Sequence, residues 1–219
     1  MSKKLKSIYI KLFKKIHLTF LLIYSIIYTV PKLFLLSISK RKIKIEFGSG
    51  PFVYSKTRNQ YLTSDRFFNC DIPWDARIPM PFLKGKVSSI YSSHFLEHLS
   101  HEELSNHFKY CANYLLKKNG NYIIAVPNAK LYIDAYYESR LSELIDLAWK
   151  PALPNSGSFI DQLNYIAYMN QEHKILFDKE FILNYLIQNG FNEAREREFD
   201  PSIDWPNRYY ESLYCIGYK

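Results

Sequence analysis

The sequence predicts an α/β protein whose sheet is doubly wound and mostly parallel, with an antiparallel hairpin at its C-terminal edge. Strand-like apolar segments alternate with segments of helical periodicity between residues 42 and 190, which is typical of parallel strands joined by crossover helices. The last two strand-like segments have no helical segment between them, so we expect them to pair as a hairpin. With 219 residues, of which 47% are hydrophobic, the chain is long enough for one domain with a core and an appendage.

The sequence of the first half of this domain predicts four strands and one tight turn. Residues 42–47 alternate between polar and apolar side chains, and the glycines of "GSGP" turn the chain directly afterwards. The next clear strands are residues 59–65 and 86–93, with a short strand at 67–70 between them.

The sequence of the second half of the domain predicts helices between the remaining strands. A helix begins at Ser100, which forms a capping box with Glu103. Lys117 and Lys118 suit the C-terminal end of this helix, and Gly120 is expected to end it. A buried strand follows at residues 121–128. Further helices are expected at 130–149, 161–170 and 178–188, and the closing strands at 191–200 and 211–219.

The positive charge of the chain is confined to its N-terminal part. The net charge is +8, yet residues 1–45 hold eleven Lys or Arg and no Asp or Glu, and the remaining residues hold 18 basic and 21 acidic side chains. A nucleic-acid-binding domain would carry basic residues over its folded face, so we expect no nucleic-acid partner. The three cysteines, Cys70, Cys111 and Cys215, form no metal-type pair and no disulfide framework, which indicates a reducing compartment.

We assign residues 1–41 to a basic and hydrophobic helical arm and residues 42–219 to the α/β domain. Apolar residues recur at helical spacing from Leu5 to Ile16 among six lysines, a pattern that suits an anionic membrane surface. The apolar run 18–30 is shorter than the ~20 residues that span a bilayer, and Pro31 interrupts it. We therefore expect a cytoplasmic protein that lies peripherally on the inner membrane, with a helix packed on the core or a true span as alternatives.

Polar residues collect at the expected carboxyl ends of the strands, where α/β sheets bind ligands. A glycine turn lets the backbone approach a ligand, and an acid at the end of the second strand can accept hydrogen bonds from ribose hydroxyls. The turn lacks the third glycine of the dinucleotide fingerprint, because that position is Val53, and Pro51 prevents a helix from starting there. A dinucleotide is therefore disfavoured.

Five segments, in order, resemble the class I S-adenosylmethionine-dependent methyltransferases, which have a Rossmann-like fold. The resemblance is strongest to a small bacterial, methyltransferase type 11-like group found among polysaccharide and cell-envelope genes. The segments are "IEFGSGP", "DARIPMPF", "SSIYSSHFLEHLS", "YLLKKNGNYIIAVPN" and "EHKILFDKEFILNYLIQNGF". The fourth segment lacks the Pro-Gly-Gly of the family, and the arm before Lys42 lies outside the resemblance.

The resemblance implies S-adenosylmethionine as the cofactor and assigns the first two strand ends to it. Gly48, Ser49 and Gly50 would wrap the methionine portion of the cofactor. Glu46 would orient this turn or bind the amino group through water. Asp65 would bind the ribose diol, although an aspartate at this place could instead cap the following turn.

The same resemblance assigns residues to the adenine and the sulfonium. Asp75 would hydrogen-bond the adenine amino group, with Ala76 beside the ring. Asp75 could instead be a plain turn residue, and Asp71 is a rival for the adenine contact. Ser92 and Ser93 would end the fourth strand beside the sulfonium.

His94 follows the fourth strand on the reactive side, where a general base would assist methyl transfer to a hydroxyl group. A structural role as a polar partner is an equal alternative for this histidine. The resemblance implies an enzyme that methylates a hydroxyl of a sugar, glycan or lipid-linked envelope intermediate. Tyr132, Tyr136 and Tyr137 would line the acceptor cleft or lie in the core, and His173 would close over the site or lie in a surface loop.

Two other functions stay open at this point. The missing glycines are compatible with a binding or scaffold protein that has kept the fold without the chemistry. The string "HFLEH" is also the H-x-x-E-H pattern of inverted zinc peptidases, with His94 and His98 as ligands and Glu97 as the base. Little room is left for a helix between Ser93 and Ser100, so we expect no metal site.

Overall fold

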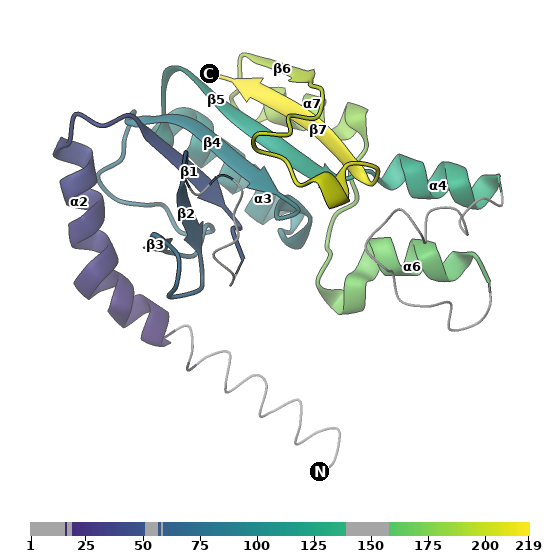
Figure 1. Ribbon diagram of the computed structural model, residues 1–219, viewed down its shortest axis with the longest axis horizontal. Coiled ribbons are helices and arrows are strands. Elements are labelled where there is room, and N and C mark those ends of the chain that lie inside the picture. Colours follow the sequence, from purple (N-terminus) through teal and green to yellow (C-terminus); the bar gives the residue numbers. More distant parts are fainter. Residues whose placement is uncertain (1–15, 17–18, 51–56, 58, 139–157) are drawn as a thin grey trace, which may run out of the picture.

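The computed structural model describes residues 16, 19–50, 57, 59–138 and 158–219, and these contain a seven-stranded sheet in the order β3-β2-β1-β4-β5-β7-β6 (Figure 1). β1 pairs in parallel with β2 and β4, β2 with β3, and β4 with β5, while β7 runs antiparallel to both β5 and β6. The predicted sheet, mostly parallel with antiparallel pairing at the C-terminal edge, is confirmed. The strands are β1 (Ile43–Phe47), β2 (Leu62–Asp65), β3 (Ile72–Pro73), β4 (Val87–Ser93), β5 (Leu116–Pro127), β6 (Glu193–Glu196) and β7 (Ser212–Tyr218).

The two faces of the sheet are covered by different segments. Helices α3 (His101–Tyr110) and α7 (Lys179–Gln188) lie behind the sheet in Figure 1 and share its main hydrophobic core. On the opposite face, Tyr91 of β4 packs with Tyr61 and with Ile203, which belongs to the connection between β6 and β7. Because side chains alternate along a strand, neighbouring residues of β4 enter different layers.

A small helical pair stands at the carboxyl end of β5. Helix α4 (Ala129–Tyr137) follows β5 directly, and α6 (Ile160–Tyr168) packs against it around Tyr132, Ala135 and Ile166 (Figure 1). The expected helix over 130–149 is therefore present as far as Tyr137, and its remainder from residue 139 lies outside the described residues.

Two predicted boundaries are wrong. The helix that begins after Ser100 ends with a π-helical turn, Cys111–Leu115, so Lys117, Lys118 and Gly120 lie in β5. Burial decides this, because Leu116 is fully buried and already pairs with Val87 of β4.

The third strand is also displaced, from the predicted 67–70 to Ile72–Pro73. A side chain fixes its position: the Asp71 carboxylate accepts hydrogen bonds from Thr63 N and Thr63 Oγ1, both at 3.0 Å. These bonds hold the start of β3 beside β2.

The expectation that Pro31 interrupts the N-terminal apolar segment is wrong as well. A continuous helix runs over Thr19–Ile38, and at 20 residues it is long and apolar enough to cross a membrane. Within it, a π-helical segment, Ser25–Thr29, precedes α2 (Val30–Ile38). Pro31 comes directly after this π-helical segment, whose last hydrogen bond runs from Val30 N to Ser25 O, so the helix passes the proline with a local change of hydrogen-bond spacing.

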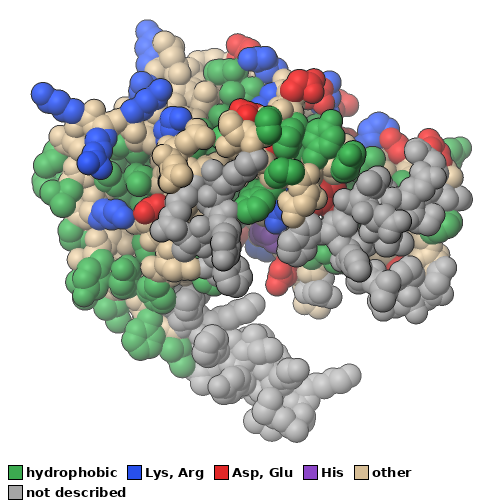
Figure 2. Space-filling view, in the orientation of Figure 1, with side chains coloured by type: hydrophobic (Ala, Val, Ile, Leu, Met, Phe, Trp, Pro, Cys, Tyr) green, Lys and Arg blue, Asp and Glu red, His purple; other side chains and the backbone are tan. Residues whose placement is uncertain are grey.

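One face of this helix packs against the edge of the sheet. Leu33 is fully buried, and Ser25 Oγ and Thr29 Oγ1 donate to the carbonyl of Pro73 in β3 at 3.2 and 3.3 Å. The opposite face is exposed and apolar, and Figure 2 shows hydrophobic side chains gathered over this part of the molecule. The exposed residues include Phe20, Leu22, Ile23, Ile26, Ile27, Phe34, Leu35 and Ile38.

Candidate functional site

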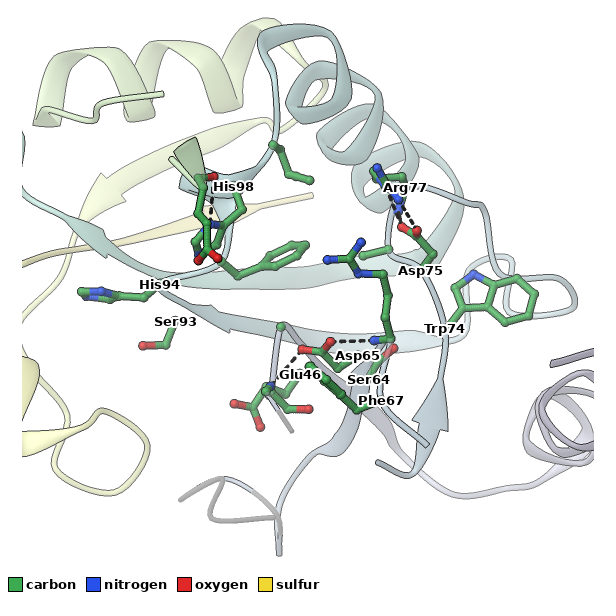
Figure 3. Close-up of a pocket in the computed structure, with 18 of the residues that line it drawn as sticks. Glu46, Ser64, Asp65, Phe67, Trp74, Asp75, Arg77, Ser93, His94 and His98 are labelled. Atoms are coloured by element: carbon green, nitrogen blue, oxygen red, sulfur yellow. Dashed lines mark hydrogen bonds and ion pairs between the residues drawn. The ribbon is translucent and has the colours of Figure 1, made fainter. Parts of the chain in front are cut away.

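A cleft of about 730 Å³ opens at the carboxyl ends of β1, β2 and β4 (Figure 3). Nine of the ten predicted site residues line it, and their cofactor-binding and catalytic roles stay predictions. The nine are Glu46, Gly48, Ser49, Gly50, Asp65, Asp75, Ala76, Ser93 and His94.

The turn after β1 is closed on one side and open on the other. Gly48 and Gly50 both have positive φ angles, +73° and +77°, which glycine adopts without strain. Gly48 N donates to Ser64 O at 3.0 Å, and a Cβ at Gly48 would lie 2.5 Å from the Phe95 side chain. A Cβ at Gly50 would meet no atom of the described residues within 4 Å. The turn is therefore held against β2 while Gly50 faces free space.

Two acids frame this turn. The Glu46 carboxylate is 4% exposed and accepts a hydrogen bond from Thr57 Oγ1. Asp65 at the end of β2 accepts from Gly50 N at 2.9 Å through Oδ2 and from Arg66 N at 2.6 Å through Oδ1. Asp65 thus organises the glycine turn and also faces the cleft, so its turn-forming role and its predicted ribose-binding role do not exclude each other.

Asp75 is bound tightly by its own loop. Arg77 donates to its carboxylate from Nε at 2.8 Å, from a terminal guanidinium nitrogen, and from the backbone N at 3.0 Å (Figure 3). Burial alone would raise the pKa of Asp75, but the hydrogen bonds and charge of Arg77 outweigh burial and lower the pKa below its ordinary value. The carboxylate is therefore engaged by Arg77, and the rival Asp71 is engaged by Thr63 and does not line the cleft.

Ser92 and Ser93 separate, because adjacent residues of a strand point to opposite faces. Ser93 lines the cleft, whereas Ser92 is fully buried and does not. Only Ser93 therefore faces the cleft, and the placement of both serines beside the sulfonium stays a prediction.

His94 leaves β4 with a φ of 50° and its backbone N donates to Ala125 O at 2.9 Å. Its Nε2 lies 2.8 Å from Ser212 Oγ, and its Nδ1 lies 4.0 Å from Glu97 Oε1. Burial, aided by the charge of Arg208, lowers the pKa of His94 well below its ordinary value, so the imidazole is neutral at neutral pH.

The expected acceptor residues do not gather at the cleft. Tyr132 is buried in the α4–α6 pair and donates from its hydroxyl to Glu211 Oε2 at 3.2 Å. Tyr136 and Tyr137 are exposed on α4, and none of the three tyrosines lines the cleft. His173 is 7% exposed, so it is not a surface-loop residue, and it lines a second and smaller cavity.

Several cleft residues escaped the sequence-based prediction. Trp74 follows β3 directly, and its Nε1 donates to Ile78 O at 2.7 Å. A correct placement of β3 would have found it as a strand-end residue. Trp205 and Arg208 come from the long connection between β6 and β7, and no local sequence signal brings that connection to the cleft.

The H-x-x-E-H string does not form the helix that an inverted zinc peptidase requires. Leu96–His98 is a single 3₁₀ turn between β4 and α3, and His94 precedes it with a left-handed backbone. Glu97 lies between the two histidines of the string, with its Oε1 4.0 Å from His94 Nδ1 and from His98 Nε2.

Solved structures of S-adenosylmethionine-dependent methyltransferases share this fold. One from Archaeoglobus fulgidus is 13% identical, and the match covers 86% of this chain and 90% of that one with a TM-score of 0.50. The S-adenosylmethionine-dependent methyltransferase SibL in its apo form is 10% identical, with 90% of this chain and 55% of that one covered and a TM-score of 0.50. No protein-family model matches the sequence, and no curated protein matches it. The chain therefore has the class I methyltransferase fold, as its sequence predicts.

Proposed function

We propose that this protein is an S-adenosylmethionine-dependent methyltransferase that methylates a hydroxyl group of a sugar, glycan or lipid-linked envelope intermediate. The observation that carries the proposal is the cleft at the carboxyl ends of β1, β2 and β4, in which a two-glycine turn is framed by Glu46 and Asp65. The cofactor, when bound, supplies a methyl group that its sulfonium already activates.

The residues of the cleft fit such a cofactor. Gly50 faces free space, and the nearby Ser49 Oγ is buried with no hydrogen-bond partner in the described part of the chain. A buried hydroxyl of this kind is suited to a polar ligand group. Trp74 and Ala76 also line the cleft and supply apolar surface on which an adenine ring would lie.

The protein's own contribution is then alignment, exclusion of water and acceptance of one proton. We assign the proton to His94, because a neutral imidazole at the end of β4 can accept it. Ser212 holds Nε2 of this ring at 2.8 Å and so fixes its orientation. Its lowered pKa makes His94 a weak base, so alignment is expected to contribute more than proton removal.

Calorimetry with S-adenosylmethionine and S-adenosylhomocysteine tests the cofactor. Asp65→Asn is expected to weaken both ligands about tenfold or more, because a hydrogen bond to a charged group contributes ~1.5–3 kcal/mol. Asp134→Asn, which changes an exposed carboxylate of α4, is the matched control and should bind normally. No binding of either ligand at millimolar concentration would contradict the proposal.

The acceptor is tested by supplying methyl-labelled cofactor together with soluble sugars, lipid-linked glycans, protein and RNA. Label in an O-methyl ether of a glycan is the expected result. Label recovered only in protein or RNA would show that the acceptor class is wrong.

We further propose that the N-terminal arm holds the enzyme on the anionic, cytoplasmic face of the inner membrane. In the most apolar 18-residue stretch of the helix Thr19–Ile38, only 22% is buried. Six lysines lie in the first 15 residues of the sequence. An exposed apolar face next to clustered lysines suits a helix that lies in the membrane interface.

Flotation of the full chain with vesicles containing anionic lipid tests this placement. Replacing Phe20, Ile27 and Leu35 with serine should release the protein from the vesicles, since all three are exposed on the helix. Serine at Ile133 and Ile187, which are exposed on α4 and α7, is the matched control and should leave binding unchanged. Equal binding by both variants would refute the membrane role of the arm.

A further inference from the structure

A group of metal-ligating side chains lies beside the cleft, at a second cavity of about 110 Å³. Glu97, His98 and His173 each offer one ligand atom, and these atoms all lie within 4.8 Å of one another. His94 and His98, both labelled in Figure 3, line the cleft and also this cavity, so the group stands at the border between the two. The predicted cofactor contacts do not use any of its three members.

Backbone hydrogen bonds fix the two histidines of the group in the form that binds metal ions. His98 Nδ1 lies 3.1 Å from Glu172 O, and His173 Nδ1 lies 2.7 Å from Ile166 O. A carbonyl oxygen only accepts, so each Nδ1 carries the hydrogen and each neutral ring keeps its lone pair on Nε2. Metal-binding histidines are commonly oriented in this way by a carbonyl on the other ring nitrogen.

The third member has an acceptor that the protein does not satisfy. Glu97 is 1% exposed, and its Oε2 is buried with no hydrogen-bond partner among the described residues. Its Oε1 is 4.0 Å from His98 Nε2 and from His94 Nδ1, which is too long for a hydrogen bond. A buried acceptor without a donor costs ~1–3 kcal/mol, so a positive ligand at this oxygen would stabilise the arrangement.

We propose that Glu97, His98 and His173 bind one divalent transition-metal ion, with Zn²⁺ as the best match. Two imidazole nitrogens and one carboxylate oxygen form a donor set that Zn²⁺ takes at catalytic sites, with bonds of ~2.0–2.2 Å. The three ligand atoms now lie within 4.8 Å of one another. A small inward movement of the side chains would therefore bring each atom within bonding distance of one shared ion. The set differs from the peptidase pattern, because Glu97 is a ligand and His173 replaces His94.

The consequence for chemistry rests on the proposed function. Three protein ligands leave a position open toward the cavity, where a hydroxyl oxygen of the acceptor can bind. A metal ion lowers the pKa of an oxygen that it binds, so the hydroxyl would lose its proton near neutral pH. The oxygen–hydrogen bond breaks and the proton leaves by way of His94 to solvent, while the oxygen forms a new bond to the methyl carbon as the bond between that carbon and the cofactor sulfur breaks, and the sulfur keeps the electron pair as S-adenosylhomocysteine leaves.

Metal titration of the full-length protein, first stripped by a chelator and without any cofactor, tests the site. Calorimetry with Zn²⁺ and the visible spectrum with Co²⁺ should each show one equivalent per chain. His98→Ala and His173→Ala should each weaken Zn²⁺ about 100-fold or more, because each removes a direct ligand and even an outer-shell change costs ~10–100-fold. His101→Ala removes an exposed histidine at the start of α3 and should change nothing.

The outcomes separate cleanly. A thermal unfolding midpoint close to that of the parent shows that a variant is folded, and Glu97→Gln gives a second ligand variant of the same shape. Absence of Zn²⁺ and Co²⁺ binding, or equal binding by the parent and both histidine variants, would overturn the site. Metal binding without cofactor binding would keep the site and refute the proposed function. Equal methyl transfer by stripped and Zn²⁺-loaded enzyme would overturn its catalytic role.

Discussion

The glycine turn after β1 allows a matched pair of substitutions, Gly48→Ala and Gly50→Ala. Both positions have nearly equal positive φ angles, +73° and +77°, so alanine pays the same backbone cost at each. That cost is ~1–2 kcal/mol for a left-handed residue with a Cβ. The two positions differ only in what the added methyl group meets.

At Gly48 the methyl group would lie 2.5 Å from Cβ and Cγ of Phe95 and 2.6 Å from Cδ2. These are contacts near the root of a packed side chain, so Phe95 cannot turn away and the backbone must shift. Overpacking of this kind costs a further ~1–3 kcal/mol. At Gly50 no atom of the part of the chain that the structure describes lies within 4 Å, so no such addition applies. Gly48→Ala should therefore lower the free energy of unfolding by roughly 2–5 kcal/mol and Gly50→Ala by roughly 1–2 kcal/mol.

Urea denaturation measures both free energies, and calorimetry with S-adenosylhomocysteine adds a second comparison. Gly50→Ala should lose more affinity than its small loss of stability suggests, because its methyl group enters the space assigned to the ligand. Equal destabilisation by the two variants would refute the packing argument at Phe95. Unchanged ligand affinity in Gly50→Ala would refute the placement of the ligand against this turn.

Three further predictions concern groups outside the turn. Arg197→Met should destabilise the protein by ~3–5 kcal/mol, because Asp204 is fully buried and would lose its two-point ion pair, measured by urea denaturation. His107 is fully buried, and burial lowers its pKa to about 4. Its contribution to stability is thus complete above pH ~6.5 and is lost as the pH falls toward 4, at about 1.4 kcal/mol per pH unit. His107→Gln should flatten the slope of stability against pH in that window by one proton. Ser100→Ala removes the oxygen that accepts from Glu103 N in the capping box and should cost ~1 kcal/mol in thermal or urea unfolding.

Each of these has a result that contradicts it. The double variant Arg197→Met, Asp204→Leu should recover part of the loss, and no recovery would mean that the buried charge is not its cause. An unchanged pH slope in His107→Gln would show that this histidine does not titrate differently on folding. A loss near zero for Ser100→Ala would mean that water replaces the cap.

The order of strands and helices follows from local patterns in the sequence. The alternation in residues 42–47, the capping box at Ser100 and the buried run before Pro127 each act within a few residues, so the fold could be predicted from them. The polar strand ends were predictable for the same reason, because the carboxyl ends of parallel strands meet at one edge. Nine of ten site residues accordingly line one cleft.

Where the prediction failed, a distant partner decided the outcome. Leu116 joined β5 because Val87 offered a buried neighbour, and β3 moved to Ile72–Pro73 because Asp71 binds Thr63. Pro31 leaves the helix continuous because a π-helical segment, Ser25–Thr29, directly precedes it. Ser92 does not line the cleft because side chains alternate along β4. The sequence shows this alternation, but the family resemblance assigned Ser92 and Ser93 together.

The sequence by itself determined the fold class, the position of the glycine turn and the charge division between arm and domain, because these depend on neighbours in the chain. Only the tertiary structure decided which side chains act together. It brought His173 from beyond α6 to Glu97 and His98, and it engaged Asp75 with Arg77. Such contacts join residues far apart in sequence or depend on side-chain direction, and spacing along the chain does not encode them.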